Sequence, residues 1–234
     1  ERHVAVKVMS PDTVAADATF VPRFLREAKL SAKLEHPHVL PIYDFGQVDD
    51  LLFLVMPLLS GGTLRDRARS GVSPLLAMEW LKSLAGALDY AHGEGVVHRD
   101  VKPANVLFDK ASRLFLADFG LAREAGSASL TVAGTVLGTP VYMSPEQVKG
   151  EAASPRSDQY ALGVLAYYLL AGTPPFEANS VFVVMEKTLR EEPALPSAIN
   201  PVLHRSVDYV LLKVLEKRPA DRFESCEAFV QALE

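Results

Sequence analysis

Residues 98–105 read His-Arg-Asp-Val-Lys-Pro-Ala-Asn, and they are the most informative part of the sequence. Two apolar runs follow it, 106–108 and 114–117, and the polar turn between them predicts an antiparallel hairpin. The residues at the open end of that hairpin are Asn105 and Asp118, so we expect them side by side, with Cα atoms within about 5 Å. An amide oxygen and a carboxylate are hard ligands that suit Mg²⁺.

The same stretch holds two more side chains that can take part in a reaction. Asp100 lies five residues before Asn105, and Lys102 lies between them. Phosphoryl transfer needs a metal to neutralise phosphate charge, a cation on the transferred phosphate and a carboxylate to orient a hydroxyl. Any one of these residues alone is an ordinary turn residue, but the set in this order indicates phosphoryl transfer.

Several separate motifs extend this interpretation. Residues 98–105 resemble the catalytic loop of protein kinases, and Asp-Phe-Gly at 118–120 resembles their metal-binding triplet. Val-Ala-Val-Lys at 4–7 resembles the strand with the phosphate-binding lysine, and Ser-Pro-Glu at 144–146 resembles the triplet that closes the activation segment. Asp158 and Arg222 fall where the family places a buried aspartate and the arginine partner of that glutamate. The chain is identified as a eukaryotic-like (Hanks-type) Ser/Thr protein kinase domain, most similar to bacterial members.

The resemblance implies a role for each catalytic group. Asp100 is expected to orient the acceptor hydroxyl or act as its base, and Asn105 and Asp118 to hold Mg²⁺, with Mn²⁺ as an alternative ion. Lys7 is expected to hold the α- and β-phosphates of ATP and to pair with Glu27 in the active state.

Acceptor type and regulation are also implied. Lys102, two residues after Asp100, and Thr139 in Gly-Thr-Pro match the Ser/Thr-specific form of the family. Arg99 is expected to pair with a phosphorylated residue of the activation segment, Thr131 by preference or Thr135. Two copies of the chain are then expected to pair for autophosphorylation in trans.

The adenine site is expected between the two lobes. Met56 aligns with the gatekeeper position, and residues 57–59 with the hinge. Pro57 lacks an N–H, so only its carbonyl can reach adenine, and Leu59 supplies further backbone groups. Ala5 and Leu107 are expected to cover the two faces of the base, although plain core packing explains each of them nearly as well.

The fold class that follows is α+β, with two lobes in one catalytic domain. Residues 1–56 form a partial, β-rich N-lobe, residues 57–62 the hinge and residues 63–234 a mainly helical C-lobe. Hydrophobic periodicity and turn residues predict strands at 3–9, 39–45 and 51–56, and helices at 20–34, 74–92, 157–171, 180–191, 203–217 and 224–233.

Composition limits the remaining choices. The 234 residues carry a formal net charge of −5, which argues against nucleic acid as a partner. Cys226 is the chain's one cysteine, so no internal disulfide can form. The longest apolar stretch, 160–172, is too short to cross a bilayer and predicts a buried helix. We expect a cytoplasmic domain whose parent protein is anchored to a membrane, if at all, by a segment outside this chain.

The chain departs from the family pattern at its front, where no glycine-rich phosphate loop precedes residue 4. We expect that loop upstream of the given residues, in an active Ser/Thr kinase that uses protein substrates and ATP. The alternative is a pseudokinase or nucleotide-binding scaffold that lacks the loop, although Lys7, Asp100, Asn105 and Asp118 argue against it. A kinase of small molecules is a third interpretation, and the activation segment from 118 to 146 argues against that one.

Overall fold

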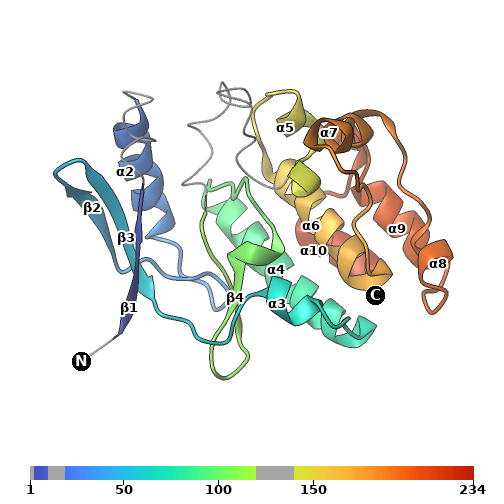
Figure 1. The fold of residues 1–234 in the computed structure, drawn as a ribbon, viewed down its shortest axis with the longest axis horizontal. Helices are drawn as coiled ribbons and strands as arrows, with labels where there is room; N and C mark the ends of the chain where they lie inside the picture. The colour runs from blue at the N-terminus through green and yellow to red at the C-terminus, as the bar shows by residue number, and fades with distance from the viewer. Residues whose placement is uncertain (1–2, 10–18, 120–139) are drawn as a thin grey trace.

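The computed structural model describes residues 3–9, 19–119 and 140–234. A sheet with strand order β1-β3-β2 forms the smaller part, and all its described pairs are antiparallel. Its strands are β1 (Val4–Val8), β2 (Asp44–Val48) and β3 (Leu51–Pro57). Helix α2 (Phe20–Ser31) lies against this sheet (Figure 1) and buries Phe20, Phe24 and Ala28 with Leu52 and Leu54 of β3. The helix thereby reaches the sheet through one apolar face.

The strand predicted at 39–45 is wrong in its position, because β2 begins only at Asp44. The apolar residues Val39 and Leu40 contact the other lobe instead. Val39 forms a parallel bridge with Leu116, and the Leu40 N–H donates to the Leu116 carbonyl at 2.9 Å. Val39 and Leu40 of the predicted strand therefore pair with the other lobe, whereas Tyr43, Asp44 and Phe45 pair with β3 of the N-lobe sheet.

The larger lobe is mainly helical and has a short hairpin on the side that faces the sheet (Figure 1). The hairpin consists of β4 (Val106–Phe108) and β5 (Leu114–Leu116), as predicted. The helices are α3 (Leu64–Ala68), α4 (Pro74–Gly93), α5 (Pro145–Val148), α6 (Pro155–Ala171), α7 (Val181–Arg190), α8 (Pro196–Ile199), α9 (Ser206–Val214) and α10 (Cys226–Leu233).

Local signals explain where α4 and α6 begin and end. The Ser73 side chain accepts a hydrogen bond from the Leu76 N–H and caps α4, with Pro74 at the first helical position. Helix α6 ends at Gly172, whose φ of 86° is a left-handed conformation that favours glycine. The longer predicted helices are confirmed, with ends that shift by one to three residues.

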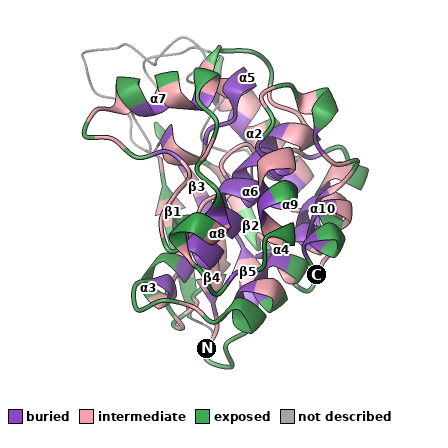
Figure 2. Ribbon diagram, turned by 90° about the vertical axis from the view of Figure 1, so that its right-hand side faces the viewer, coloured by how far each residue is buried: buried purple, intermediate pink, exposed green. Residues whose placement is uncertain are grey.

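Helix α6 is the centre of the larger lobe. Fourteen of its 17 residues are buried, and Figure 2 shows it purple behind α8 and α9. The prediction of a buried helix at the apolar stretch 160–172 is therefore confirmed. Among the described residues, no helix is both long and apolar enough to cross a membrane.

Candidate active site

A carboxylate of α6 accepts two hydrogen bonds from the backbone of the catalytic loop. Asp158, which is 1% exposed, accepts from the His98 N–H through Oδ2 and from the Arg99 N–H through Oδ1, both at 2.7 Å. Arg99 has a φ of 68°, a costly conformation for a residue with a side chain. The two short hydrogen bonds to an ionised acceptor compensate for that strain.

His98 joins the loop to the end of β5. Its Nε2 lies 2.9 Å from the Ala117 carbonyl, which can only accept, so Nε2 carries a proton. Its Nδ1 accepts from the Asp100 N–H at 3.2 Å, so the ring is neutral. The ring also packs on Phe119, with centroids 4.6 Å apart. His98 therefore couples the position of Asp100 to the segment that carries Asp118.

Asp100, Lys102 and Asn105 converge as a compact group. The Lys102 ammonium lies 2.6 Å from Oδ2 of Asp100, and Nδ2 of Asn105 donates to the same oxygen at 3.1 Å. Nδ2 of Asn105 also donates to the Asp100 carbonyl at 2.8 Å. Since the amide nitrogen is used in this way, the amide oxygen of Asn105 is the atom that can take a metal.

Asp118 lies one position beyond the place predicted for it. The register pairs Val106 with Leu116, and the Ala117 N–H donates to the Asn105 carbonyl at 2.9 Å, so Ala117 is the residue across from Asn105. Asp118 follows with a φ of 66°. That left-handed turn brings its carboxylate to the N-lobe, where Oδ2 lies 2.8 Å from the Lys7 ammonium.

The predicted pair of Lys7 and Glu27 is not formed in this arrangement. Lys7 pairs with Asp118, and Oε2 of Glu27 lies 3.8 Å from Nη1 of Arg99. Both acidic groups thus contact a cation, but neither has the predicted partner: Glu27 was expected to pair with Lys7 in the active state, and Asp118 to hold a metal. Lys7 and Asp118 are in direct contact, and phosphate oxygens and a metal would have to enter between them.

The residues predicted around adenine lie on β3, β1 and β4. Ala5 is directly opposite Met56 in the sheet, and Pro57 ends β3. Leu107 pairs with Phe115, and both are half-buried while their neighbours are buried. Leu59 belongs to the connection that follows β3.

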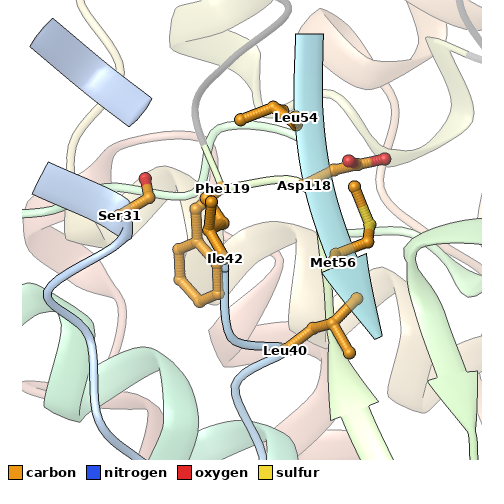
Figure 3. Close-up of a pocket in the computed structure, with 7 residues that line it drawn as sticks. All are labelled: Ser31, Leu40, Ile42, Leu54, Met56, Asp118 and Phe119. Carbon is orange, nitrogen blue, oxygen red and sulfur yellow. The ribbon is translucent and has the colours of Figure 1, made fainter. Parts of the chain in front are cut away.

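Met56 also lines a small cavity of about 10 Å³, drawn in Figure 3, beside Ser31, Ile42 and Phe119. That volume holds about one water molecule. It is a gap in the packing among α2, β3, the segment before β2 and the residues Asp118 and Phe119, and adenine would need a larger space. The predicted regulatory and substrate-loop residues Thr131, Thr135 and Thr139 lie outside the described residues.

The predicted partnership of Glu146 and Arg222 is confirmed. The guanidinium donates from Nη1 and Nη2 to the two carboxylate oxygens, each at 2.9 Å, in a buried bidentate pair. Burial raises the pKa of the Glu146 carboxyl, but the hydrogen bond and charge of Arg222 outweigh it and lower that pKa. Beside it, Nε2 of Gln147 donates to the Arg99 carbonyl at 2.9 Å. The segment after residue 140 is thereby attached to the catalytic loop.

Sequence reasoning missed His92, which supports the loop from the last turn of α4. Its Nε2 lies 2.8 Å from Oδ2 of Asp158, and its Nδ1 lies 3.7 Å from Oδ1 of Asp89. Burial lowers the pKa of this imidazole, but the hydrogen bonds to Asp158 and Asp89 outweigh it and raise the pKa to about 9. A single histidine near a helix end has no local signal for this role, because its partners lie up to 66 residues away.

Known proteins resemble this chain over nearly its whole length. The sequence pattern of the family described as Protein kinase domain matches residues 1–232. The chain is 37% identical to the serine/threonine-protein kinase PrkC of Bacillus subtilis over 97% of its own length and 35% of the relative's. It is 39% identical to the serine/threonine-protein kinase PknB of Mycobacterium tuberculosis over 96% of its length and 37% of the relative's.

The chain thus spans about a third of the length of these curated relatives. Among solved structures, the PknI kinase domain of Mycobacterium tuberculosis superposes with a TM-score of 0.77 at 36% identity, covering 98% of this chain and 84% of that one. The predicted two-lobed fold and its bacterial relatives are confirmed, and the chain belongs to the protein kinase domain family.

Proposed function

We propose that this chain transfers the γ-phosphate of ATP to Ser and Thr hydroxyl groups of proteins. Two observations carry the proposal: the contact of Lys7 with Asp118, and the group of Asp100, Lys102 and Asn105 on the catalytic loop. The hydrogen bond from the Ala117 N–H to the Asn105 carbonyl joins the segments that carry these two sets. Relatives named serine/threonine-protein kinases, aligned over nearly the whole chain, support the same acceptor type.

The donor set fits Mg²⁺. Asp118 offers a carboxylate and Asn105 an amide oxygen, and both are hard oxygen ligands. Nδ2 of Asn105 is already held by Asp100, so the amide is pre-oriented. The ion, when bound, would neutralise charge on the phosphates and so favour transfer.

The chain's own residues would then do the positioning. Asp100 would accept a hydrogen bond from the acceptor hydroxyl and hold its oxygen in line with the phosphorus. Lys102, 2.6 Å from Asp100, would move its ammonium toward the transferred phosphate. Lys7 would leave Asp118 for the α- and β-phosphates, and Glu27 would leave Arg99 to support it.

Arg99 would then exchange its present contacts, that with Glu27 among them, for a phosphate group of the activation segment. We include in the proposal that Thr131 or Thr135 is autophosphorylated in trans, within a pair of chains, and that Thr139 faces the protein substrate. The parent protein is proposed to present this domain in the cytoplasm, with any membrane anchor in a segment outside this chain.

The test is transfer of labelled phosphate from ATP with Mg²⁺ by the full-length protein, to itself and to a generic Ser/Thr-rich protein. Asp100→Asn should reduce kcat by about 10²–10⁴-fold while ATP binding persists, because the residue acts on the acceptor and not on the nucleotide. Asp50→Asn, at an exposed turn of the N-lobe, is the matched control and should leave transfer unchanged.

Two results would contradict the proposal. Equal transfer by wild type and Asp100→Asn would remove Asp100 from the reaction. ATP binding without any transfer by the wild type would favour the nucleotide-binding scaffold. Mapping of phosphorylated residues in the active protein would separately decide between Thr131 and Thr135.

A further inference from the structure

A group of three side chains outside the candidate active site brings together oxygen, nitrogen and sulfur atoms. Asp89 and His92 lie in the last turns of α4, and Cys226 is the first residue of α10. Their carboxylate, imidazole and thiol atoms all lie within 4.8 Å of one another. The two helices pack together in the larger lobe beside α6 (Figure 1). The group therefore depends on tertiary packing and not on a local motif.

The orientation of His92 is a second, independent observation. Its Nε2–H donates to the buried carboxylate of Asp158 at 2.8 Å. Histidines that bind metals almost always donate their far ring nitrogen to a carboxylate or carbonyl in this way, which fixes the ring and makes the other nitrogen more basic. Here the other nitrogen, Nδ1, is the one that faces Asp89.

Space next to the group is the third observation. Asp89, His92 and Cys226 all line an open cavity of about 390 Å³. Arg156, Glu224 and Glu227 also line it, so charged groups of both signs surround the entrance. The cavity supplies a path for an ion and room for a water molecule as an additional ligand.

We propose that Asp89, His92 and Cys226 bind one divalent transition-metal ion of the Zn²⁺ class. A thiolate, an imidazole and a carboxylate favour Zn²⁺ or Co²⁺ over Mg²⁺, which prefers oxygen ligands. Three protein ligands leave the fourth tetrahedral position to a water molecule from the cavity. The ligand atoms would approach one another slightly, because bonds of about 2.0–2.3 Å bring them closer than they lie here.

The present hydrogen bonds of Asp89 are compatible with this role. Its oxygens accept from the Cys226 and Glu227 N–H groups at 2.9 and 2.8 Å, which caps α10. An ionised carboxylate has about four acceptor positions, so a capping oxygen can also bind a metal. The thiol of Cys226 and Nδ1 of His92 would each release one proton, so a divalent ion leaves the charge of the group unchanged.

Co²⁺ is the sharpest probe, because a cobalt–thiolate bond has a charge-transfer band in the near ultraviolet. Cys226 is the one cysteine of the given 234 residues, so comparison with Cys226→Ser decides whether the band comes from this site. The full-length protein should be titrated in its Asp118→Asn form, which weakens the oxygen site proposed for Mg²⁺. We expect a charge-transfer band that saturates at one equivalent of Co²⁺ and disappears in Cys226→Ser.

Asp89→Asn tests the set of ligands, because it keeps the size of the side chain and loses the anionic oxygen. It should weaken Co²⁺ binding by at least about 10-fold, because even the loss of an outer-shell partner of a metal ligand costs about 10–100-fold. Unchanged affinity in Asp89→Asn would overturn the three-ligand proposal. So would the absence of a charge-transfer band in folded Asp118→Asn protein at saturating Co²⁺.

Zn²⁺ gives a readout that needs no spectroscopy. At free Zn²⁺ about 100-fold above its Kd, the melting temperature of the Asp118→Asn protein should rise by roughly 5–10 °C. The rise should be lost in the Asp118→Asn, Cys226→Ser double variant. An equal rise in both proteins would show that Zn²⁺ binds elsewhere and would contradict the proposed site. None of these measurements depends on phosphoryl transfer.

Discussion

Replacement of Arg222 by methionine tests whether the buried pair with Glu146 holds the larger lobe together. The side chains of Arg222 and Glu146 are 0% and 5% exposed, and two hydrogen bonds of 2.9 Å join them. Arg222→Met keeps the apolar stem and removes the charge. Glu146 would keep the Ser157 hydroxyl at 2.8 Å, and its buried anion would lose its cation.

The expected loss follows from that uncompensated charge. Removing one partner of a buried ion pair costs about 3–5 kcal/mol in the free energy of unfolding. The guanidinium also donates to the carbonyls of Glu216, Arg156 and Lys217, which places this pair toward the upper end. In a domain of this size the melting temperature should fall by roughly 10 °C.

The pH dependence has a defined sign. Because the pKa of Glu146 is lowered in the folded state, its contribution to stability is present above the unfolded value of about 4.5 and is lost as the pH falls through the folded value. The difference between wild type and Arg222→Met should therefore be largest at neutral pH. It should shrink as the pH falls below about 4.5 and the carboxyl becomes protonated.

The assay is urea denaturation at several pH values, with Arg218→Met as the matched control. Arg218 pairs with Asp221 at 3.5 Å, but its side chain is 80% exposed, so its removal should change the free energy by less than about 0.5 kcal/mol. A loss below about 1 kcal/mol for Arg222→Met, with an unchanged denaturant slope, would show that the buried pair does not stabilise the lobe. So would a difference that grows in acid.

Three further substitutions test other parts of the structure. Gly61→Ala should destabilise the chain by about 1–3 kcal/mol in urea denaturation, because its Cβ would lie 2.3 Å from the Asp109 carbonyl oxygen; an unchanged midpoint would contradict that contact. Ser73→Ala should cost about 1 kcal/mol in the same measurement, since it removes the cap of α4, and a neutral result would mean that the cap contributes nothing. Asp158→Asn should lower kcat about 100-fold, because it disturbs the main-chain hydrogen bonds that position the catalytic loop. Full activity of this variant in steady-state kinetics would exclude the positioning role.

The sequence predicted most of the fold because the signals that define it are local. Ser73 and Pro74 mark the start of α4, and the capping hydrogen bond of Ser73 reaches only three residues along the chain. Two apolar runs around a polar turn predict the hairpin of β4 and β5. The failure at residues 39–45 has an equally plain cause. Extended conformation is encoded locally, but the choice of partner strand is not, and Val39 and Leu40 found theirs in the hairpin of the other lobe.

The types and order of the residues are enough to predict the family, the two-lobed fold and the polar residues proposed for the active site. The partners of charged side chains depend on the packed chain instead: Lys7 contacts Asp118, Glu27 lies near Arg99, and His92 lies between Asp158 and Asp89. An ion pair is chosen by distance and burial, and both are properties of the packed chain. A carboxylate such as Asp118 can pair with any cation that the fold brings within about 4 Å, so its partner has no signature in the residues around it.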